Sequence, residues 1–160
     1  MIASTSVLLP IENVQQRNAG TCWASCVAQA LKFLTGRTVG ETELCTIAGV
    51  RPEHGATEHD MAKLFGRFGT FQCRTMAATP PDRVTLILAR RHPIILSLCV
   101  GRRFRAHAVV LRGIFKDPNG YHAVVNDPNL ADYFSMFVQF SRLQAAWHTG
   151  LVVAPKAQVL

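Results

Sequence analysis

The sequence lacks the features that mark several common classes of protein. No apolar run approaches the ~20 residues that a membrane-spanning helix needs. A secretory signal typically has Lys or Arg before its apolar stretch, and no such residue precedes the short apolar stretch near the N-terminus. Internal repeats, low-complexity tracts and linkers are also absent. We therefore expect one soluble domain over residues 1–160, either cytoplasmic or exported by a route that needs no such signal, or a piece of a longer protein.

Metal-binding and disulfide patterns are missing as well. The chain has five cysteines: Cys22, Cys26, Cys45, Cys73 and Cys99. Their odd number and the absence of a CxxC pair argue against a disulfide framework and a zinc ribbon. The spacing of His54 and His59 does not give an HExxH motif. We expect no metal and no cofactor, a reducing compartment, and at least one thiol that performs chemistry.

Acidic residues are scarce relative to basic ones. Ten Asp and Glu stand against 17 Lys and Arg, so the net charge is +7 and the isoelectric point is about 9.7. Such a balance can attract nucleic acid or another anionic partner. The basic residues are scattered outside two short clusters and lack an aromatic stacking motif, so a solvated basic face and an acidic partner remain equally open and nucleic acid is disfavoured.

The informative stretch is residues 16–34. From Cys22 onward, apolar residues recur at helical spacing, and Gly36 can end the helix. Cys22 then lies in the first turn, where unpaired N–H groups and the positive end of the helix dipole favour the thiolate. The Gln16 amide, beside the backbone N–H of Cys22, would complete a two-donor oxyanion hole. Cys26, one turn deeper, is expected to be an ordinary buried thiol.

The remaining pattern predicts an α+β fold, with a helical N-terminal half packed against a C-terminal antiparallel β-sheet. Residues 5–16 are expected to be extended. Helices are expected over residues 22–34, 41–50, 57–68 and 79–89, with a further helical turn over 141–147. Strands are expected over residues 93–100, 107–115, 121–126, 133–140 and 151–154.

A cysteine nucleophile needs a base, and His107 is the best placed of the six histidines. It begins one strand of a predicted hairpin whose partner strand ends at Asn126 and Asp127, so the hairpin returns an acceptor to the imidazole. His122 is less suitable because it and Asp127, an odd number of positions apart, project to opposite faces of a regular strand.

Two segments resemble those of papain-like cysteine peptidases. The nucleophile segment of that family is similar to Gln16, Gly20, Thr21, Cys22, Trp23 and Ala24. The segments beginning at His107 and ending at Asp127-Pro128 resemble those of compact bacterial members, which include bacteriocin-leader peptidases of ABC transporters and effector proteases of plant pathogens. The resemblance spans residues 12–154.

The resemblance implies a role for each of these residues. Cys22 would attack a peptide or amide carbonyl, His107 would shuttle the proton, Asp127 would orient His107, and Gln16 would help to bind the oxyanion. Cys22, His107 and the residue that orients His107 would form a catalytic triad. Asn126 is an alternative to Asp127 as the third residue, because papain relatives use asparagine there. We favour Asp127, because the Asp-Pro pair resembles the compact bacterial members.

A basic loop at residues 101–105 immediately precedes His107 and should border the cleft. Arg103 and Arg105, which lie in this loop, are expected to favour acidic side chains or an anionic partner near the scissile bond. Trp23 and Asn126 are further candidate substrate contacts.

The leading hypothesis is a cysteine endopeptidase that hydrolyses peptide bonds through a thioester, acting as a bacterial effector or toxin. A Cys-His-Asp amidase, deamidase or acyltransferase would use the same thioester with a different acceptor. A third hypothesis, from another class, is a basic module that binds nucleic acid or an acidic partner and has an inactive triad.

Overall fold

Helices dominate the first half of the chain and strands the second. The computed structural model describes residues 6–100, 105–129 and 135–156. Within them the helices are α1 (Cys22–Thr35), α2 (Glu41–Ala48), α3 (Glu58–Phe68), α4 (Pro81–Ala89) and α5 (Phe140–Ala146). The strands are β1 (Val7–Leu8), β2 (Phe71–Met76), β3 (Ile94–Val100), β4 (Arg105–Asp117), β5 (Gly120–Asn126), β6 (Ser135–Gln139) and β7 (Trp147–Pro155).

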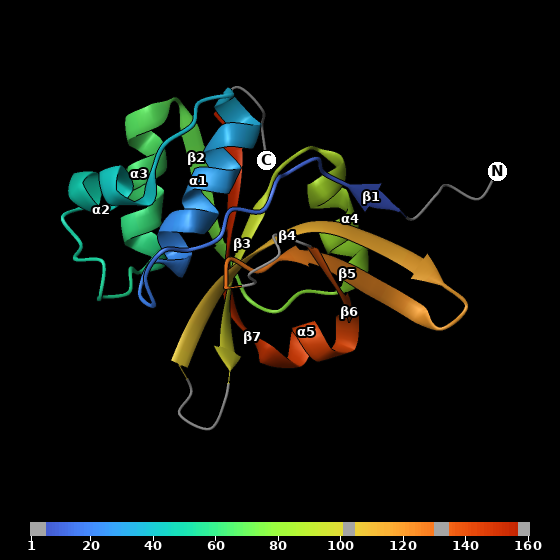
Figure 1. Cartoon of the computed structure of the whole chain (residues 1–160). Coiled ribbons are helices and arrows are strands. Elements are labelled where there is room, and N and C mark those ends of the chain that lie inside the picture. Colours follow the sequence, from blue (N-terminus) through green and yellow to red (C-terminus); the bar gives the residue numbers. More distant parts are fainter. Residues whose placement is uncertain (1–5, 101–104, 130–134, 157–160) are drawn as a thin grey trace.

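The strands form one antiparallel sheet in the order β2-β7-β3-β4-β5-β6, and β1 pairs with β4 beyond the end of β3. Figure 1 shows α1, α2 and α3 gathered together, apart from α4 and α5. The predicted α+β class is confirmed. Among the described residues, none of the helices has the length and apolar character that a membrane crossing requires.

Local sequence signals set the helix ends where they were expected. Gly36 adopts a left-handed conformation with φ 74° and closes α1, because glycine has no Cβ to oppose it. Thr57 and Asp60 form the reciprocal capping box at the start of α3. α4 begins at Pro81, whose missing N–H is not needed in a first turn.

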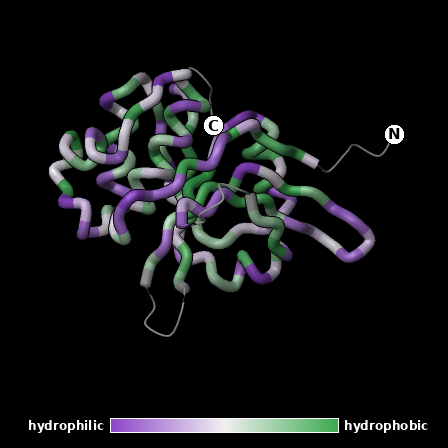
Figure 2. The backbone as a smooth tube through the Cα atoms, viewed as in Figure 1, coloured by the Kyte–Doolittle hydropathy of each residue, from purple (hydrophilic) through white to green (hydrophobic). Residues whose placement is uncertain are grey.

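The register of the sheet shows which of its two faces α1 covers. Asn126, Val110, Ile95 and Leu151 lie in one row across four strands, and the Asn126 side chain bonds to Gln29 of α1. Side chains alternate along a strand, so the neighbouring row projects to the opposite face. α1 therefore packs on the Asn126 face, and its stripe of buried residues joins those of the sheet in one core. Figure 2 shows hydrophobic residues at the centre of the molecule and hydrophilic residues toward the tip of the β4–β5 hairpin.

The prediction missed two strands in the first half of the chain. β2 pairs along its whole length with β7, and the short β1 pairs with β4. β2 is an edge strand with no fully buried position, and two adjacent exposed residues, Arg74 and Thr75, interrupt its alternation, so neither an apolar run nor a strict alternation signals it. β7 is also longer than the predicted 151–154, because it pairs with both β2 and β3.

Candidate active site

Cys22 is the first residue of α1, reached through a tightly held loop. The Thr21 hydroxyl is buried and donates to the carbonyl of Asn18, while the Asn18 N–H donates back to that hydroxyl. Gly20 lies so close to the 51–55 segment that a Cβ on it would sit 2.4 Å from the Pro52 carbonyl oxygen. These contacts fix the direction in which the Cys22 side chain leaves the helix.

The Cys22 sulfur faces a part of β4 that β5 does not reach. β5 ends at Asn126, opposite Val110, whereas β4 extends back to Arg105. The backbone N–H of Ala108, in this overhanging part, donates to Cys22 Sγ at 3.5 Å. The sheet thus supplies the thiol with a hydrogen-bond donor that would otherwise belong to a strand ladder.

His107 lies between Cys22 and a carboxylate. Its Nε2 is 2.6 Å from Oδ1 of Asp127, the residue that follows the last residue of β5. The same carboxylate oxygen accepts from the Asn129 N–H at 2.9 Å. With Nε2 held by Asp127, Nδ1 is the ring nitrogen left to interact with the Cys22 thiol.

The pKa values of the three groups shift as an ion pair requires. Burial by itself would raise the pKa of the Cys22 thiol, but the hydrogen bond to His107, the Ala108 N–H and the His107 charge lower it below its usual value. Hydrogen bonds to Asp127 and then to Cys22 raise the pKa of His107 to about 9. Burial opposes ionisation of Asp127, yet the hydrogen bond from His107 keeps its pKa below the usual range. The direction of each shift favours a thiolate beside an imidazolium.

Asn126 and Asp127, which the sequence left as alternatives, point to different places. The Asn126 side chain is fully buried; its amide donates to the Ile11 carbonyl at 2.8 Å and to Gln29 Oε1 at 3.0 Å. Arg112, at a bulge in β4, donates to Asn126 Oδ1 at 2.9 Å. Asp127 is the one whose side chain contacts the imidazole.

A chain of amides joins the two sides of the site. Gln29 lies on α1 two turns after Cys22 and donates to Asn13 Oδ1 at 3.1 Å. The Asn13 amide in turn donates to the backbone carbonyl of Asp127 at 2.9 Å. Together with the Asn126–Gln29 bond, these contacts tie the helix that carries the thiol to the strand end that carries the carboxylate.

Gln16 lies near the site, but its amide is turned toward its own loop. Its Nε2 donates to the Asn18 carbonyl at 2.8 Å and lies 3.4 Å from that of Ala19. Its backbone N–H donates to the Pro128 carbonyl at 2.8 Å, which holds the loop against the segment after β5. An amide NH₂ has two hydrogens, so the short contact to Asn18 uses one of them.

The prediction that Trp23 and Asn126 contact the substrate is wrong. Trp23 and Asn126 are only 2% and 0% exposed, so neither side chain offers a surface to a substrate. Trp23 packs in the core under α1, and Asn126 belongs to the amide network. Arg103 and the side chain of Arg105 lie outside the described residues, and the predicted role of the basic loop stays a prediction. Cys26 is fully buried, as expected.

Sequence reasoning missed Ala108, Asn13 and Gln29. The Ala108 contribution is a backbone N–H, so its side chain carries no signal. Gln29 did carry one: it is a polar residue seven positions after Cys22, within the apolar stripe of a helix, and it is 1% exposed. A buried amide must be hydrogen-bonded, so such a residue indicates a polar partner.

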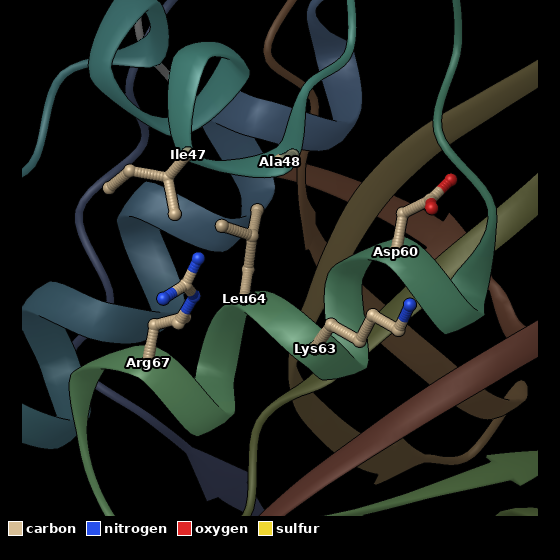
Figure 3. Close-up of a pocket in the computed structure, with 6 residues that line it drawn as sticks. All are labelled: Ile47, Ala48, Asp60, Lys63, Leu64 and Arg67. Carbon is tan, nitrogen blue, oxygen red and sulfur yellow. The ribbon is translucent and has the colours of Figure 1, made fainter.

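Two hollows among the residues that the structure describes lie away from Cys22 and His107. One of about 240 Å³ lies between α2 and α3, and Figure 3 shows its lining: Ile47, Ala48, Asp60, Lys63, Leu64 and Arg67. A groove of about 520 Å³ lies between residues 12–17, α1 and the start of α2. Neither brings a nucleophile together with a base.

Several solved structures share this fold. The peptidase domain of Streptococcus ComA, a bi-functional ABC transporter involved in quorum sensing, matches with a TM-score of 0.70 at 18% identity, over 91% of this chain and 99% of that one. A double glycine motif protease from an AMS/PCAT transporter, in complex with the leader peptide, matches equally well at 18% identity, over 94% and 95%. The recombinant stem bromelain precursor matches with a TM-score of 0.68 at 13% identity, over 95% and 70%.

At these identities the likeness establishes the fold, which is papain-like. A search of curated protein sequences found no match. The fold, together with a family profile that matches residues 4–145, places the chain in the class of papain-like cysteine proteases. More particularly, it belongs to the family described as papain-like cysteine protease AvrRpt2, whose profile matches residues 4–145.

Proposed function

We propose that the chain is a cysteine endopeptidase in which Cys22 is the nucleophile, His107 the general acid–base and Asp127 the residue that orients His107. One observation carries this proposal: the Cys22 sulfur meets the Ala108 N–H and the His107 ring, and the far nitrogen of that ring bonds to Asp127. A buried structural cysteine would have neither the lowered pKa nor the base.

In the acylation step, the Cys22 thiolate attacks the scissile carbonyl carbon and forms a tetrahedral oxyanion. The backbone N–H of Cys22, at the first position of α1, has no acceptor within the helix and is free to stabilise that charge. The second donor is the Gln16 amide, which must turn from the Asn18 carbonyl toward the substrate. The intermediate collapses as His107 protonates the leaving amine, leaving a thioester on Cys22.

In the deacylation step, His107 is neutral and accepts a proton from water, whose oxygen attacks the thioester carbonyl. A second oxyanion forms at the same two donors, the C–S bond breaks, and the carboxylic acid product leaves. Asp127 retains its negative charge throughout and holds the imidazole so that Nδ1 faces the sulfur. The thiolate–imidazolium pair is restored for the next cycle.

The substrate class is a peptide or protein. A solved structure with this fold, the double glycine motif protease, is in complex with the leader peptide, which supports a peptide as the ligand here. The proposal includes a preference for acidic side chains near the scissile bond, from the basic loop at residues 101–105, and the role of an exported bacterial effector or toxin.

The test is incubation of the purified chain with a peptide library, followed by mass spectrometry. Hydrolysis between residues produces paired fragments with new N- and C-termini. A deamidase would instead leave each peptide intact and change its mass by about one dalton. An acyltransferase that acts on a side-chain amide would release ammonia and attach an acceptor, so the peptide would gain the mass of the acceptor less that of ammonia. Internal fragments that disappear in Cys22→Ala and in His107→Ala support the endopeptidase; intact peptides with changed masses support the alternative enzymes.

The substrate preference is tested with the same library. Changing Arg102, Arg103 and Arg105 together to Ala should remove the preference for acidic side chains. An unchanged preference contradicts the role of the loop without affecting the proposed triad.

A further inference from the structure

A hollow of about 320 Å³ lies between α4 and the sheet, and three arginines line it. Arg83 lies on α4, Arg90 is the C-cap residue that follows it, and Arg74 comes from β2. The apolar part of the lining includes Ile87 and Val152. Its volume is at the small end of the range of ligand pockets, which is about 300–1,000 Å³.

The hollow lies on the face of the sheet opposite α1. Arg74 pairs with Val152 and Val152 with Ile94, so these residues form one row across β2, β7 and β3. The adjacent row contains Ile95 and continues to Asn126, whose side chain bonds to Gln29 of α1. Neighbouring rows project to opposite faces, so Arg74 points away from the helix that carries Cys22. The hollow is therefore a separate site.

The charges in this hollow are uncompensated. Among the residues that the structure describes, the lining contains no carboxylate, and the guanidinium groups of Arg74, Arg83 and Arg90 form no ion pair or hydrogen bond. Some arginines elsewhere in the described residues do have structural partners: Arg91 lies over the Phe33 ring, and Arg112 bonds to Asn126. The three in the hollow have no such contact.

A solvated helix end does not account for the arrangement. Arg90 caps the C-terminus of α4, where a positive charge is favourable against the helix dipole. That explanation does not extend to Arg83, near the other end of α4, or to Arg74 on a different element. Buried His92, three residues after the end of α4, is also part of the lining.

We infer that this hollow binds an anion that carries more than one phosphate group. A guanidinium is planar and always charged, and it binds phosphate oxygens through paired N–H donors. Three of them, brought together from a helix and a strand, would reach different oxygens of one ligand and relieve their mutual repulsion. The phosphates can belong to a small soluble molecule or to a lipid headgroup.

The experiment is isothermal titration calorimetry of the whole chain with sodium tripolyphosphate at constant ionic strength. The test variant combines Arg74→Gln, Arg83→Gln and Arg90→Gln. The matched control combines Lys63→Gln, Arg67→Gln and Arg142→Gln, which removes the same charge from exposed positions on α3 and α5. All six side chains are exposed, so both variants should fold like the parent, which thermal unfolding without ligand verifies.

Tripolyphosphate should bind the parent and the control with similar affinity, and the test variant should bind at least about tenfold more weakly. Equal weakening in both variants would mean that only overall charge matters, and would overturn the site. So would a parent chain that does not bind tripolyphosphate.

The source of the phosphate is identified by sedimentation with phosphatidylcholine vesicles, with and without phosphatidylinositol bisphosphate. Sedimentation that requires both the charged lipid and the three arginines identifies a lipid headgroup. Arginine-dependent binding of tripolyphosphate without such sedimentation identifies a soluble ligand. Either result supports the phosphate site, and neither depends on whether the chain cleaves peptides.

Discussion

Nε2 of His107 lies 2.6 Å from Oδ1 of Asp127, although 20 residues separate them in the sequence. This contact leaves Nδ1 for the sulfur of Cys22 and raises the pKa of His107 to about 9, first through the Asp127 hydrogen bond and then through that of Cys22. The carboxylate thus influences a thiol that it does not touch.

Asp127→Asn should move the alkaline limit of activity to lower pH. The imidazolium form of His107 predominates below its pKa of about 9 and is lost as the pH rises through that value. A neutral amide at position 127 stabilises the imidazolium less, so the pKa should fall toward its ordinary value of about 6.5. The check is kcat/KM on a cleaved peptide between about pH 5 and 10. An unmoved alkaline limb would show that Asp127 does not set the His107 charge.

Cys22 should be alkylated before any other thiol. Its pKa is held below the usual value by His107 and Ala108 despite burial, whereas burial raises the pKa of Cys73 to about 11. Iodoacetamide at about pH 6.5 should therefore modify Cys22 first, because the thiolate is the reactive form. Peptide mapping by mass spectrometry gives the order. His107→Ala should slow labelling of Cys22 and leave that of Cys73 unchanged; equal rates in the parent chain would contradict the lowered pKa.

Gln29→Ala should reduce both stability and activity. The substitution leaves the buried Asn126 amide and the partly buried Asn13 amide without their shared partner, and an unmade buried hydrogen bond costs about 1–3 kcal/mol. Because Asn13 holds the Asp127 carbonyl, kcat should fall beyond the loss of folded protein. Urea unfolding and kcat at saturating substrate measure the two effects. Gln72→Ala, at an exposed position on β2, is the control and should change neither. A normal kcat in folded Gln29→Ala would limit the amide chain to a structural role.

Gly20→Ala should disturb the segment that leads to Cys22. The added Cβ would lie 2.4 Å from the Pro52 carbonyl oxygen and 2.8 Å from the carbonyl carbon of Glu53, so the backbone must shift. Overpacking of this kind costs about 1–3 kcal/mol. Thermal unfolding should show the loss, and peptide cleavage should fall with it. Gly55→Ala, whose Cβ meets nothing within 4 Å, should behave like the parent. Identical behaviour of the two variants would show that the loop accommodates the added methyl group without loss of stability.

The elements that were predicted well depend on neighbours in the sequence. The helix after Cys22, its end at Gly36 and the capping box of Thr57 and Asp60 are set by contacts three or four residues apart, which spacing reveals. β2 escaped prediction because its partner, β7, lies at the other end of the chain. An edge strand of this kind forms because it pairs with its partner strand, more than because of its own amino-acid composition.

The sequence by itself determined which residues could perform thiol chemistry and which local segments carry them. The amino-acid types, the helix that begins at Cys22 and the hairpin that returns to His107 all follow from short-range pattern. Only the tertiary structure decided that Asp127 and not Asn126 faces the ring, that Trp23 is buried, and that Ala108 donates to the sulfur. The reason is physical. Side chains alternate along a strand, and β5 does not pair with the first residues of β4, so the register and the lengths of the strands decide which groups meet at the site. Register and strand length are both set by pairing between segments that are distant in the sequence.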